Sequence, residues 1–191
     1  MISKSDLRRH LISLRQDFVK SHAYPWRTDG NWPVDLMNLA AKAKCVGGYV
    51  AVRTEANVTS LLDHLSTLGS TIALPYLSDR GADLEFRLHT KDNPLVRAPF
   101  GFQQPVSFAP AGLPDVILTP LVGFDRAMNR IGQGAGHYDR FFARQPGALR
   151  IGVAWSVQEV VSIHVDPWDM PLDAVITEKE WIIGKNSRIT G

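Results

Sequence analysis

The sequence DVILTPLVGFDRAMNRIGQGAGHYDRFFAR, residues 115–144, has the order of a strand, a glycine-rich loop and a helix. Its apolar start at residues 116–118 is typical of a buried strand. Tyr138, Phe141 and Phe142 then follow one another at the spacing of a single helical face. Because strands that alternate with helices build α/β proteins, this stretch predicts that class of fold.

Three alternate glycines, Gly132, Gly134 and Gly136, form the loop of this stretch. Glycine takes up positive φ at no steric cost and has no Cβ atom to hold a ligand away, so that successive N–H groups can point at phosphate oxygens. A helix that begins near Gly136 adds free N–H groups and the positive end of its dipole. The loop therefore predicts an anion site, with Arg130 as a bidentate phosphate ligand and Asp139 as a candidate Mg²⁺ ligand.

This loop differs from the two common phosphate-binding motifs. A P-loop requires Lys and then Ser or Thr after its last glycine, whereas His137 and Tyr138 follow here. A dinucleotide-binding motif requires G-x-G-x-x-G, and the spacing here is G-x-G-x-G. The glycines alone are equally consistent with a surface turn before a helix that Asp139 caps. Arg130 before the glycines and Asp139 after them favour the anion site.

The rest of the chain alternates between strand-like and helix-like segments, which predicts one α/β domain over residues 1–191. Ser3 and Asp6 have capping-box spacing ahead of a helix over about residues 4–20. A second helix is expected where leucines recur from Leu61 until Gly69 ends it. We expect a three-layer sandwich, in which helices cover both faces of a mostly parallel sheet and a ligand crevice lies at the carboxyl ends of its strands. The expected strands are residues 46–52, 71–74, 84–88, 116–118, 151–155 and 174–177.

Composition indicates a compact protein of the cytoplasm. The chain has 191 residues, of which 45% are hydrophobic, enough for one domain with a full core. No stretch is long and apolar enough for a membrane span, and a net charge of +2 is too small to indicate a nucleic-acid partner. The single cysteine, Cys45, excludes an internal disulfide and is expected to be a small buried residue. Residues 21–33, with Trp26 and Trp32, are expected to form a surface loop or a lid.

The residues around the glycine loop resemble the signature of the 5-formyltetrahydrofolate cyclo-ligases, also called methenyltetrahydrofolate synthetases. The positions that carry this resemblance are Pro120, Phe124, Asp125 and the run Arg130, Ile131, Gly132, Gln133, Gly134, Ala135, Gly136, His137, Tyr138 and Asp139. Further positions match in order along most of the chain. They are Lys4 and Arg8 for an N-terminal K-x-x-x-R, Glu55 for a substrate-side glutamate, Gln104 and Pro105 for the turn after the family's pterin-side aromatic residue, and Asp169 for a late acidic residue.

The resemblance implies an enzyme of folate one-carbon metabolism. ATP would phosphorylate the formyl oxygen of 5-formyltetrahydrofolate, and the N10 atom of the substrate would then attack the activated carbon and expel phosphate. The products would be 5,10-methenyltetrahydrofolate, ADP and phosphate. Because the nucleophile belongs to the substrate, this chemistry needs positioning and charge neutralisation rather than a nucleophilic side chain.

The resemblance also assigns roles to residues. Arg130, Lys4 and Arg8 are expected to be catalytic through charge neutralisation. ATP is expected to contact these three and Gly132, Gln133, Gly134, Ala135, Gly136, His137 and Tyr138. The folate substrate is expected to contact Glu55, Phe100 and His137, and Mg²⁺ to be held by Asp139 and Asp169. The expected ligands are ATP and the folate, and we expect neither a nucleic-acid partner nor a membrane partner. The protein is expected to be a monomer.

Lys4 and Arg8 have two interpretations. Both lie at the start of the first expected helix, where the helix dipole disfavours positive charge. The residues alone favour a solvated basic face that Asp6 partly compensates. The family resemblance instead places phosphates beside them.

Three positions depart from the family pattern. His137 stands where the family usually has tyrosine, Met128 replaces a common glycine, and Ala135 lacks a side-chain donor. Two other classes of protein therefore stay open. One is a non-catalytic nucleotide-binding regulatory protein. The other is a sugar-phosphate isomerase or transferase, for which Glu55 would have to serve as the base.

Overall fold

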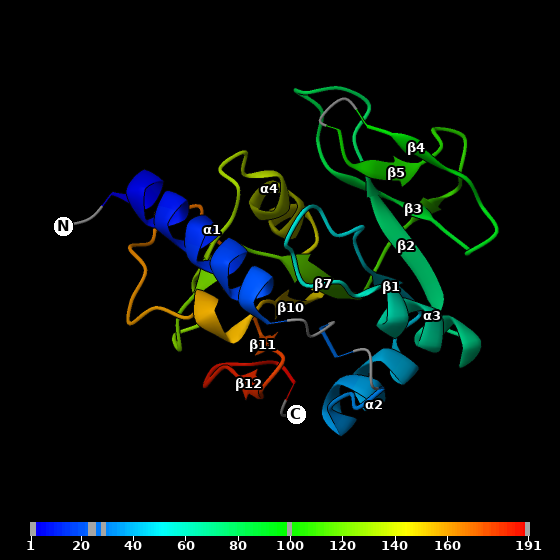
Figure 1. Ribbon diagram of the computed structural model, residues 1–191. Coiled ribbons are helices and arrows are strands. Elements are labelled where there is room, and N and C mark those ends of the chain that lie inside the picture. The colour runs from blue at the N-terminus through cyan, green and yellow to red at the C-terminus, as the bar shows by residue number, and fades with distance from the viewer. Residues whose placement is uncertain (1–2, 23–25, 28–29, 99–100, 190–191) are drawn as a thin grey trace.

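The computed structural model describes residues 3–22, 26–27, 30–98 and 101–189. Within these ranges its centre is an eight-stranded sheet with the strand order β12-β11-β10-β7-β1-β2-β3-β6 (Figure 1). The strands of this sheet are β1 (Cys45–Gly47), β2 (Thr71–Tyr76), β3 (Glu85–Leu88), β6 (Ala111–Gly112), β7 (Val116–Pro120), β10 (Leu149–Val153), β11 (Ala174–Ile176) and β12 (Trp181–Ile183). Two hairpins stand apart from it, β4 (Leu95–Arg97) with β5 (Gln103–Pro105), and β8 (Gly123–Phe124) with β9 (Arg130–Ile131).

The middle of the sheet is parallel and its flanks are antiparallel. Strands β11, β10, β7, β1 and β2 run parallel to one another, with Val46 of β1 paired to both Ile72 and Val116. β12 pairs antiparallel at one edge, and β3 and β6 pair antiparallel at the other. Parallel strands that are buried on both faces form continuous apolar runs, which is why the sequence revealed them. The prediction of a mostly parallel sheet is confirmed.

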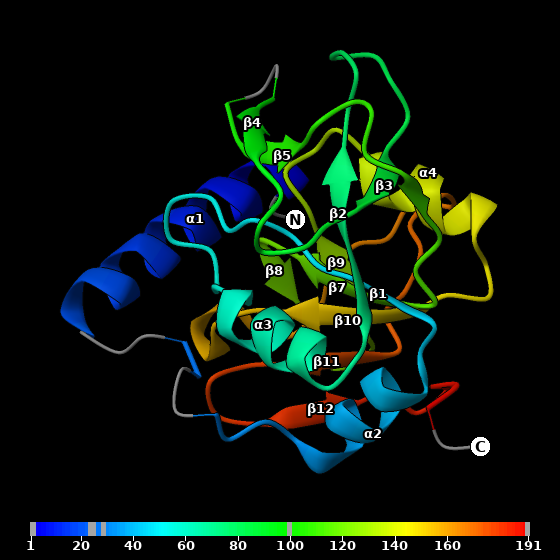
Figure 2. The same cartoon turned by 90° about the vertical axis from the view of Figure 1, so that its right-hand side faces the viewer.

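Helices cover both faces of the sheet, as the turned view shows (Figure 2). Val116 and Leu118 of β7 pack in one apolar cluster with residues of α2 (Val34–Lys42) and α3 (Thr59–Thr67). Ile117, the residue between them, packs in another cluster with Phe142 of α4 (His137–Arg144). Successive strand residues point to opposite faces, so this alternation confirms the three-layer sandwich. The sequence had not revealed α2.

Helix α1 (Lys4–Ser21) begins at the residue that the sequence predicts and ends within one residue of the expected end. Ser3 caps it, because its hydroxyl oxygen accepts a hydrogen bond of 3.0 Å from the N–H of Asp6. Leu11 packs with Val122 beside the β8–β9 hairpin. A Cβ atom at Gly123 would lie 2.4 Å from Cδ1 of Leu11, so glycine permits this close approach. No helix in the described ranges has the length and apolar character to span a membrane.

Two expectations about the chain path were wrong. The glycine loop does not follow the sheet strand β7 directly, because the β8–β9 hairpin lies between them. The segment of residues 21–33 is not merely a surface loop or lid, since Trp26 is 2% exposed and Trp32 is also buried in the main core. The indole Nε1 of Trp26 donates a hydrogen bond of 3.0 Å to the carbonyl of Ala154, which fixes it there. Residues 23–25 and 28–29 lie outside the described part.

Of two local expectations around Cys45, its burial was confirmed, whereas the strand expected over residues 46–52 was wrong beyond Gly47. Cys45 is buried at the start of β1. That strand ends at Gly47, earlier than expected, and Gly48 then lies against Leu62, where a Cβ atom would be 2.4 Å from Cδ1. The chain after Gly48 leaves the sheet at its carboxyl edge.

Candidate functional site

A pocket of about 520 Å³ lies at the carboxyl edge of the parallel strands. One face of α1, the loop after β1 and the ends of β2 and β7 form part of its wall. The stretch from Arg130 to Asp139 and the segment around Asp169 complete it. The pocket lies where parallel α/β sheets place their ligands. All predicted site residues in the described ranges line it: Lys4, Arg8, Glu55, Arg130, Gly132, Gln133, Gly134, Ala135, Gly136, His137, Tyr138, Asp139 and Asp169. Phe100 lies outside the described residues.

The glycine loop has the backbone that the sequence predicted at two of its three glycines. Gly134 has φ +106° and Gly136 has φ +67°, in the region that favours glycine. Gly136 is the N-cap of α4, and no side chain of the residues that the structure describes caps the N–H groups of the first turn. Arg8 Nε donates a hydrogen bond of 2.7 Å to the carbonyl of Gly132, which ties α1 to the loop. The loop thus offers free backbone donors and a nearby guanidinium to an anion.

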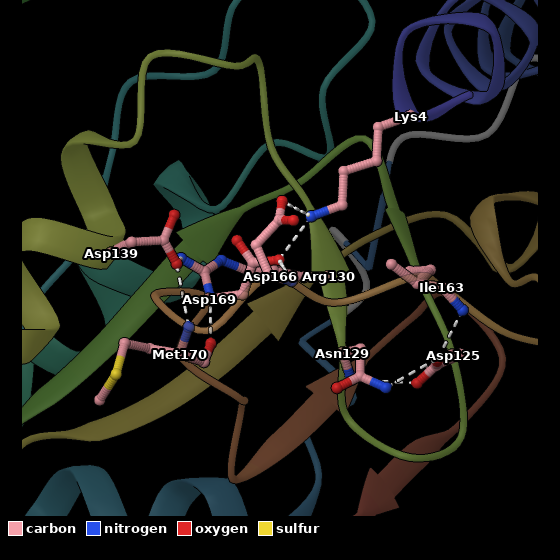
Figure 3. A network of polar contacts seen from close by, with 9 residues as sticks. All are labelled: Lys4, Asp125, Asn129, Arg130, Asp139, Ile163, Asp166, Asp169 and Met170. Carbon is pink, nitrogen blue, oxygen red and sulfur yellow. Dashed lines mark hydrogen bonds and ion pairs between the residues drawn. The ribbon is translucent and has the colours of Figure 1, made fainter.

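Arg130 connects three elements of the pocket wall (Figure 3). Its Nη2 lies 2.7 Å from Oδ1 of Asp139 in α4, and its Nη1 donates to the carbonyl of Met170. The N–H of Met170 donates to the same Asp139 oxygen at 3.1 Å. The guanidinium also lies 5.1 Å from the ring centre of Phe142, and its side chain is 5% exposed. Arg130 is therefore engaged with protein groups here, and direct phosphate binding by it stays a prediction.

Lys4 extends from α1 toward two carboxylates, those of Asp166 and Asp169 (Figure 3). Its Nζ lies 2.6 Å from Oδ2 of Asp166 and 2.6 Å from Oδ2 of Asp169. Burial lowers the pKa of Lys4, but hydrogen bonds to the two carboxylates outweigh this effect and raise the pKa above its ordinary value. Burial by itself would raise the pKa of Asp169. Hydrogen bonds from the N–H of Asp166 and from Lys4 have the larger effect, so that the pKa of Asp169 lies below its ordinary value. The interpretation from the residues alone, in which Asp6 partly compensates a solvated basic face, was wrong. Asp6 pairs with Ser3 and Arg9 instead.

Asp139 and Asp169 have donor atoms that suit a magnesium ion. Oδ1 of Asp139 and Oδ2 of Asp169 accept the hydrogen bonds named above. Their other oxygens, Oδ2 of Asp139 and Oδ1 of Asp169, accept none from the part of the chain that the structure describes. In the same part no group of three or more His, Cys, Asp or Glu side chains is arranged for a metal. Because Mg²⁺ needs only one or two carboxylates when phosphates and water complete its shell, the pair fits Mg²⁺ bound together with a nucleotide.

Asp125 connects the β8–β9 turn to the segment that leads to Asp166 and Asp169. It is 2% exposed, and its Oδ1 accepts hydrogen bonds of 3.0 Å from the N–H groups of Ala127 and Asn129. Its Oδ2 accepts from Nδ2 of Asn129 at 3.0 Å and from the N–H of Ile163 at 2.8 Å (Figure 3). One buried carboxylate thus closes the β8–β9 turn and ties it to the segment that leads to Asp166.

Glu55 lies opposite the glycine loop. Its Oε2 accepts a hydrogen bond of 3.0 Å from the N–H of Val52, and its Oε1 lies 3.3 Å from Nε2 of Gln133. The loop after β1 is held by Tyr49, whose hydroxyl donates to the carbonyl of Ala56 at 2.5 Å. The side of the pocket predicted for the folate therefore touches the side predicted for the phosphates.

His137 and Tyr138 begin α4 at the pocket wall. Burial lowers the pKa of His137, and the nearby Arg140 lowers it further. Burial also raises the pKa of Tyr138, so that its hydroxyl is a neutral donor. Both shifts favour the neutral form of the side chain. An anion at the loop would therefore be attracted by the backbone N–H groups and by the neighbouring cations.

The sequence missed several residues of the pocket. Arg15, Tyr49, Asp166 and Trp168 line it as well. Arg15 follows Lys4 and Arg8 on the same helical face, and this spacing was the available signal. Asp166 lies three residues before Asp169 in a short acidic run, which gave a weaker one.

Fold and pocket together define a class, an α/β protein with a glycine-rich loop at a helix N-terminus beside two carboxylates, at the carboxyl edge of its sheet. Residues 1–178 match the model of the 5-formyltetrahydrofolate cyclo-ligase family. The chain belongs to this family, as the motifs indicated.

Curated relatives and solved structures agree with this membership. The chain is 31% identical over 193 residues to a 5-formyltetrahydrofolate cyclo-ligase of Mycolicibacterium smegmatis, an alignment that covers 95% of this chain and 96% of the relative. It is 32% identical to the corresponding protein of Escherichia coli, over 73% and 81% of the two chains. Its fold resembles that of 5,10-methenyltetrahydrofolate synthetase from Aquifex aeolicus, with a TM-score of 0.77, 26% identity and coverage of 98% and 95%. The prediction of a ligase is thereby confirmed at the level of the family.

Proposed function

We propose that this protein converts 5-formyltetrahydrofolate to 5,10-methenyltetrahydrofolate with consumption of ATP and release of ADP and phosphate. One observation carries the proposal. The contact between Glu55 and Gln133, at 3.3 Å, joins a carboxylate suited to the N–H groups of a pterin to the loop suited to phosphate. Family membership supports the same activity. We further propose a monomer in the cytoplasm without nucleic-acid or membrane partners, consistent with the net charge of +2.

The pocket suits a transfer between two bound substrates. The formyl oxygen would attack the γ-phosphorus of ATP, so that an O–P bond forms while the bond to the β-phosphate oxygen breaks and ADP leaves. N10 would then attack the formyl carbon, lose its proton and close the ring as phosphate departs. Arg8, the loop N–H groups and Lys4 would offset the charge on the phosphates, and Glu55 would orient the pterin. Asp139 and Asp169 would hold Mg²⁺, which neutralises phosphate charge.

The test measures ADP release with and without 5-formyltetrahydrofolate, together with the near-ultraviolet absorbance of the methenyl product. We expect both signals to depend on both substrates. A regulatory nucleotide-binding protein would release no ADP in response to the folate, and an isomerase would need no ATP, so either result would overturn the proposal. Glu55→Gln should reduce turnover at least tenfold, because an amide cannot accept from two pterin N–H groups as a carboxylate does. Arg9→Met, on the exposed face of α1, is the control that should leave turnover unchanged.

A further inference from the structure

Arg15 is a buried cation in the pocket wall, and no carboxylate of the described residues lies within ion-pair distance of it. The residue is 4% exposed, and no ion pair in the described ranges includes it. Its Nε donates to Oγ1 of Thr54 at 3.2 Å, and its Nη1 lies 3.5 Å from the carbonyl oxygen of Leu121, at the limit of a hydrogen bond. Nη2 makes no hydrogen bond with any described residue, although the side chain lines the pocket. Nη2 is not among the fully buried atoms that lack a partner in the described part of the chain, so this donor is open to the pocket. An acceptor on a bound ligand can therefore pair with it in place of water.

The charges around Arg15 indicate what kind of ligand this is. Burial lowers the pKa of Arg15, while the charge of Glu55 opposes that shift. Arg15 and Glu55 together bring no net charge to their side of the pocket. The uncompensated attraction for anions lies instead at the glycine loop, with Arg8 and the first turn of α4. The side with Arg15 therefore suits a neutral polar group that presents an acceptor next to donors.

The local structure holds Arg15 and Glu55 in a fixed relation. Thr54, which accepts from Arg15, is the neighbour of Glu55 in the chain. The carbonyl of Thr54 accepts a hydrogen bond of 2.9 Å from Nε1 of the buried Trp155. One short segment, anchored to the core, thus positions both the donor and the acceptor. Such preorganisation is what a specificity site requires.

We propose that Arg15 determines specificity for the pterin ring by donating a hydrogen bond from Nη2 to the ring carbonyl oxygen. Glu55 accepts from the ring N–H and amino group beside that carbonyl. The pterin edge has this order of acceptor and donors, so the two side chains read it together. The inference deepens the proposed function and rests on it.

The experiment compares Arg15→Met and Arg15→Lys with the control Arg9→Met, which makes the same change on the exposed face of α1. We expect Arg15→Met to raise KM for 5-formyltetrahydrofolate about 10- to 100-fold, because a charge-assisted hydrogen bond is lost. KM for ATP and kcat should stay within about threefold, because the phosphates bind at the other side of the pocket. Arg15→Lys should show a smaller rise in the folate KM, since an ammonium donates but lacks the second Nη.

A second measurement separates recognition from a structural role. Calorimetry would compare binding of 5-formyltetrahydrofolate with binding of its 4-amino-4-deoxy analogue, in which a donor replaces the carbonyl acceptor. The wild-type protein should prefer the carbonyl form, and Arg15→Met should lose most of that preference. A merely destabilised pocket would weaken both ligands equally.

The outcomes distinguish the two proposals. If the wild-type protein turns over the folate and Arg15→Met keeps its KM and its preference, the role of Arg15 is overturned while the proposed function stands. If Arg15→Met does not fold, Arg15→Lys decides, and an unchanged folate KM in that variant overturns the role. If the wild-type protein neither binds nor turns over the folate, the proposed function fails and the role of Arg15 fails with it.

Discussion

Nη2 of Arg130 lies 2.7 Å from Oδ1 of Asp139, and the same oxygen accepts a hydrogen bond from the N–H of Met170. The arginine thus orients one of the two carboxylates proposed for Mg²⁺ through Oδ1. The other oxygen of that carboxylate, Oδ2, accepts no hydrogen bond from the described residues. This relation changes what substitution of Arg130 should do. A residue that only gripped phosphate would be dispensable for the folded state, whereas this one also joins β9, α4 and the segment at Met170.

Arg130→Met should therefore impair both stability and turnover. Loss of the partly buried ion pair should lower the free energy of unfolding by about 2 kcal/mol, because Asp139 loses its cationic partner. Turnover should fall at least tenfold at temperatures where the variant is folded. Urea unfolding and initial rates would measure the two effects. The double variant that also carries Asp139→Asn shows whether Arg130 acts only through Asp139. If it does, the losses in turnover of the two single variants will not add in the double variant. Additive losses would instead indicate that Arg130 binds phosphate directly.

The glycine loop offers a matched pair of substitutions. Gly134→Ala should raise KM for ATP several-fold, because φ of +106° is strained for any L-residue and the loop would shift. Gly132→Ala is the control, since its backbone is not in that region and a Cβ atom there would meet no atom of the described residues within 4 Å. Steady-state kinetics with varied ATP would compare them. Equal effects of the two substitutions would show that the backbone conformation at 134 is not what binds the phosphates.

Met128 and Gly184 are expected to be energetically coupled. Met128 has φ +68°, and a Cβ atom at Gly184 would lie 2.6 Å from Cγ of Met128. Gly184→Ala should destabilise the protein by about 1 to 3 kcal/mol through overpacking. In a Met128→Gly background, where that side chain is absent, the same change should cost about 1 kcal/mol less. Urea unfolding of the four proteins gives the coupling, and additive effects would exclude it.

Asp173 should contribute to acid denaturation. Burial raises the pKa of Asp173, but hydrogen bonds from Arg188 and from the N–H of Arg150 lower it by more, so that its pKa lies below the ordinary value. The corresponding stability is present above the unfolded pKa of about 4 and is lost as the pH falls through the lower folded value. Asp173→Asn should lose less stability than the wild-type protein between about pH 4 and pH 2. Urea unfolding across this range would measure the difference, and the exposed Asp92→Asn should behave like the wild-type protein.

Cys45 should be chemically silent in the folded protein. Burial, with a smaller effect from the carboxylate of Asp115, raises the pKa of its thiol to about 11. A thiol reagent at pH 8 should react fully in denaturing urea and only very slowly without it. Since the folded pKa exceeds the unfolded value of about 8.5, the thiol contributes stability below that value and loses it as the pH rises toward 11. Cys45→Ala should remove this part of the alkaline loss, and fast labelling of the native protein would contradict the assignment.

The local sequence pattern was sufficient to predict the elements whose buried residues recur at a regular spacing. The apolar run of β7, the capping of α1 by Ser3 and the N-terminus of α4 at Gly136 all follow from neighbours in the chain. Local pattern failed where an element depends on distant partners. Trp26 and Trp32 lie among polar residues and prolines in the sequence, and only the main apolar core and the hydrogen bond from Trp26 to the carbonyl of Ala154 explain their burial.

The candidate site divides along the same line. The grouping of residues 130–139 at one pocket could be predicted from the chain itself, because the glycines, the arginine and the aspartate are close in sequence. Their roles in binding stay a prediction. The pairing of Lys4 with Asp166 and Asp169 and the burial of Arg15 beside the glutamate of another loop join segments more than 38 residues apart. Such contacts arise because folding brings segments that are remote in the chain to one edge of the sheet, and no periodicity within a segment encodes which of them meet.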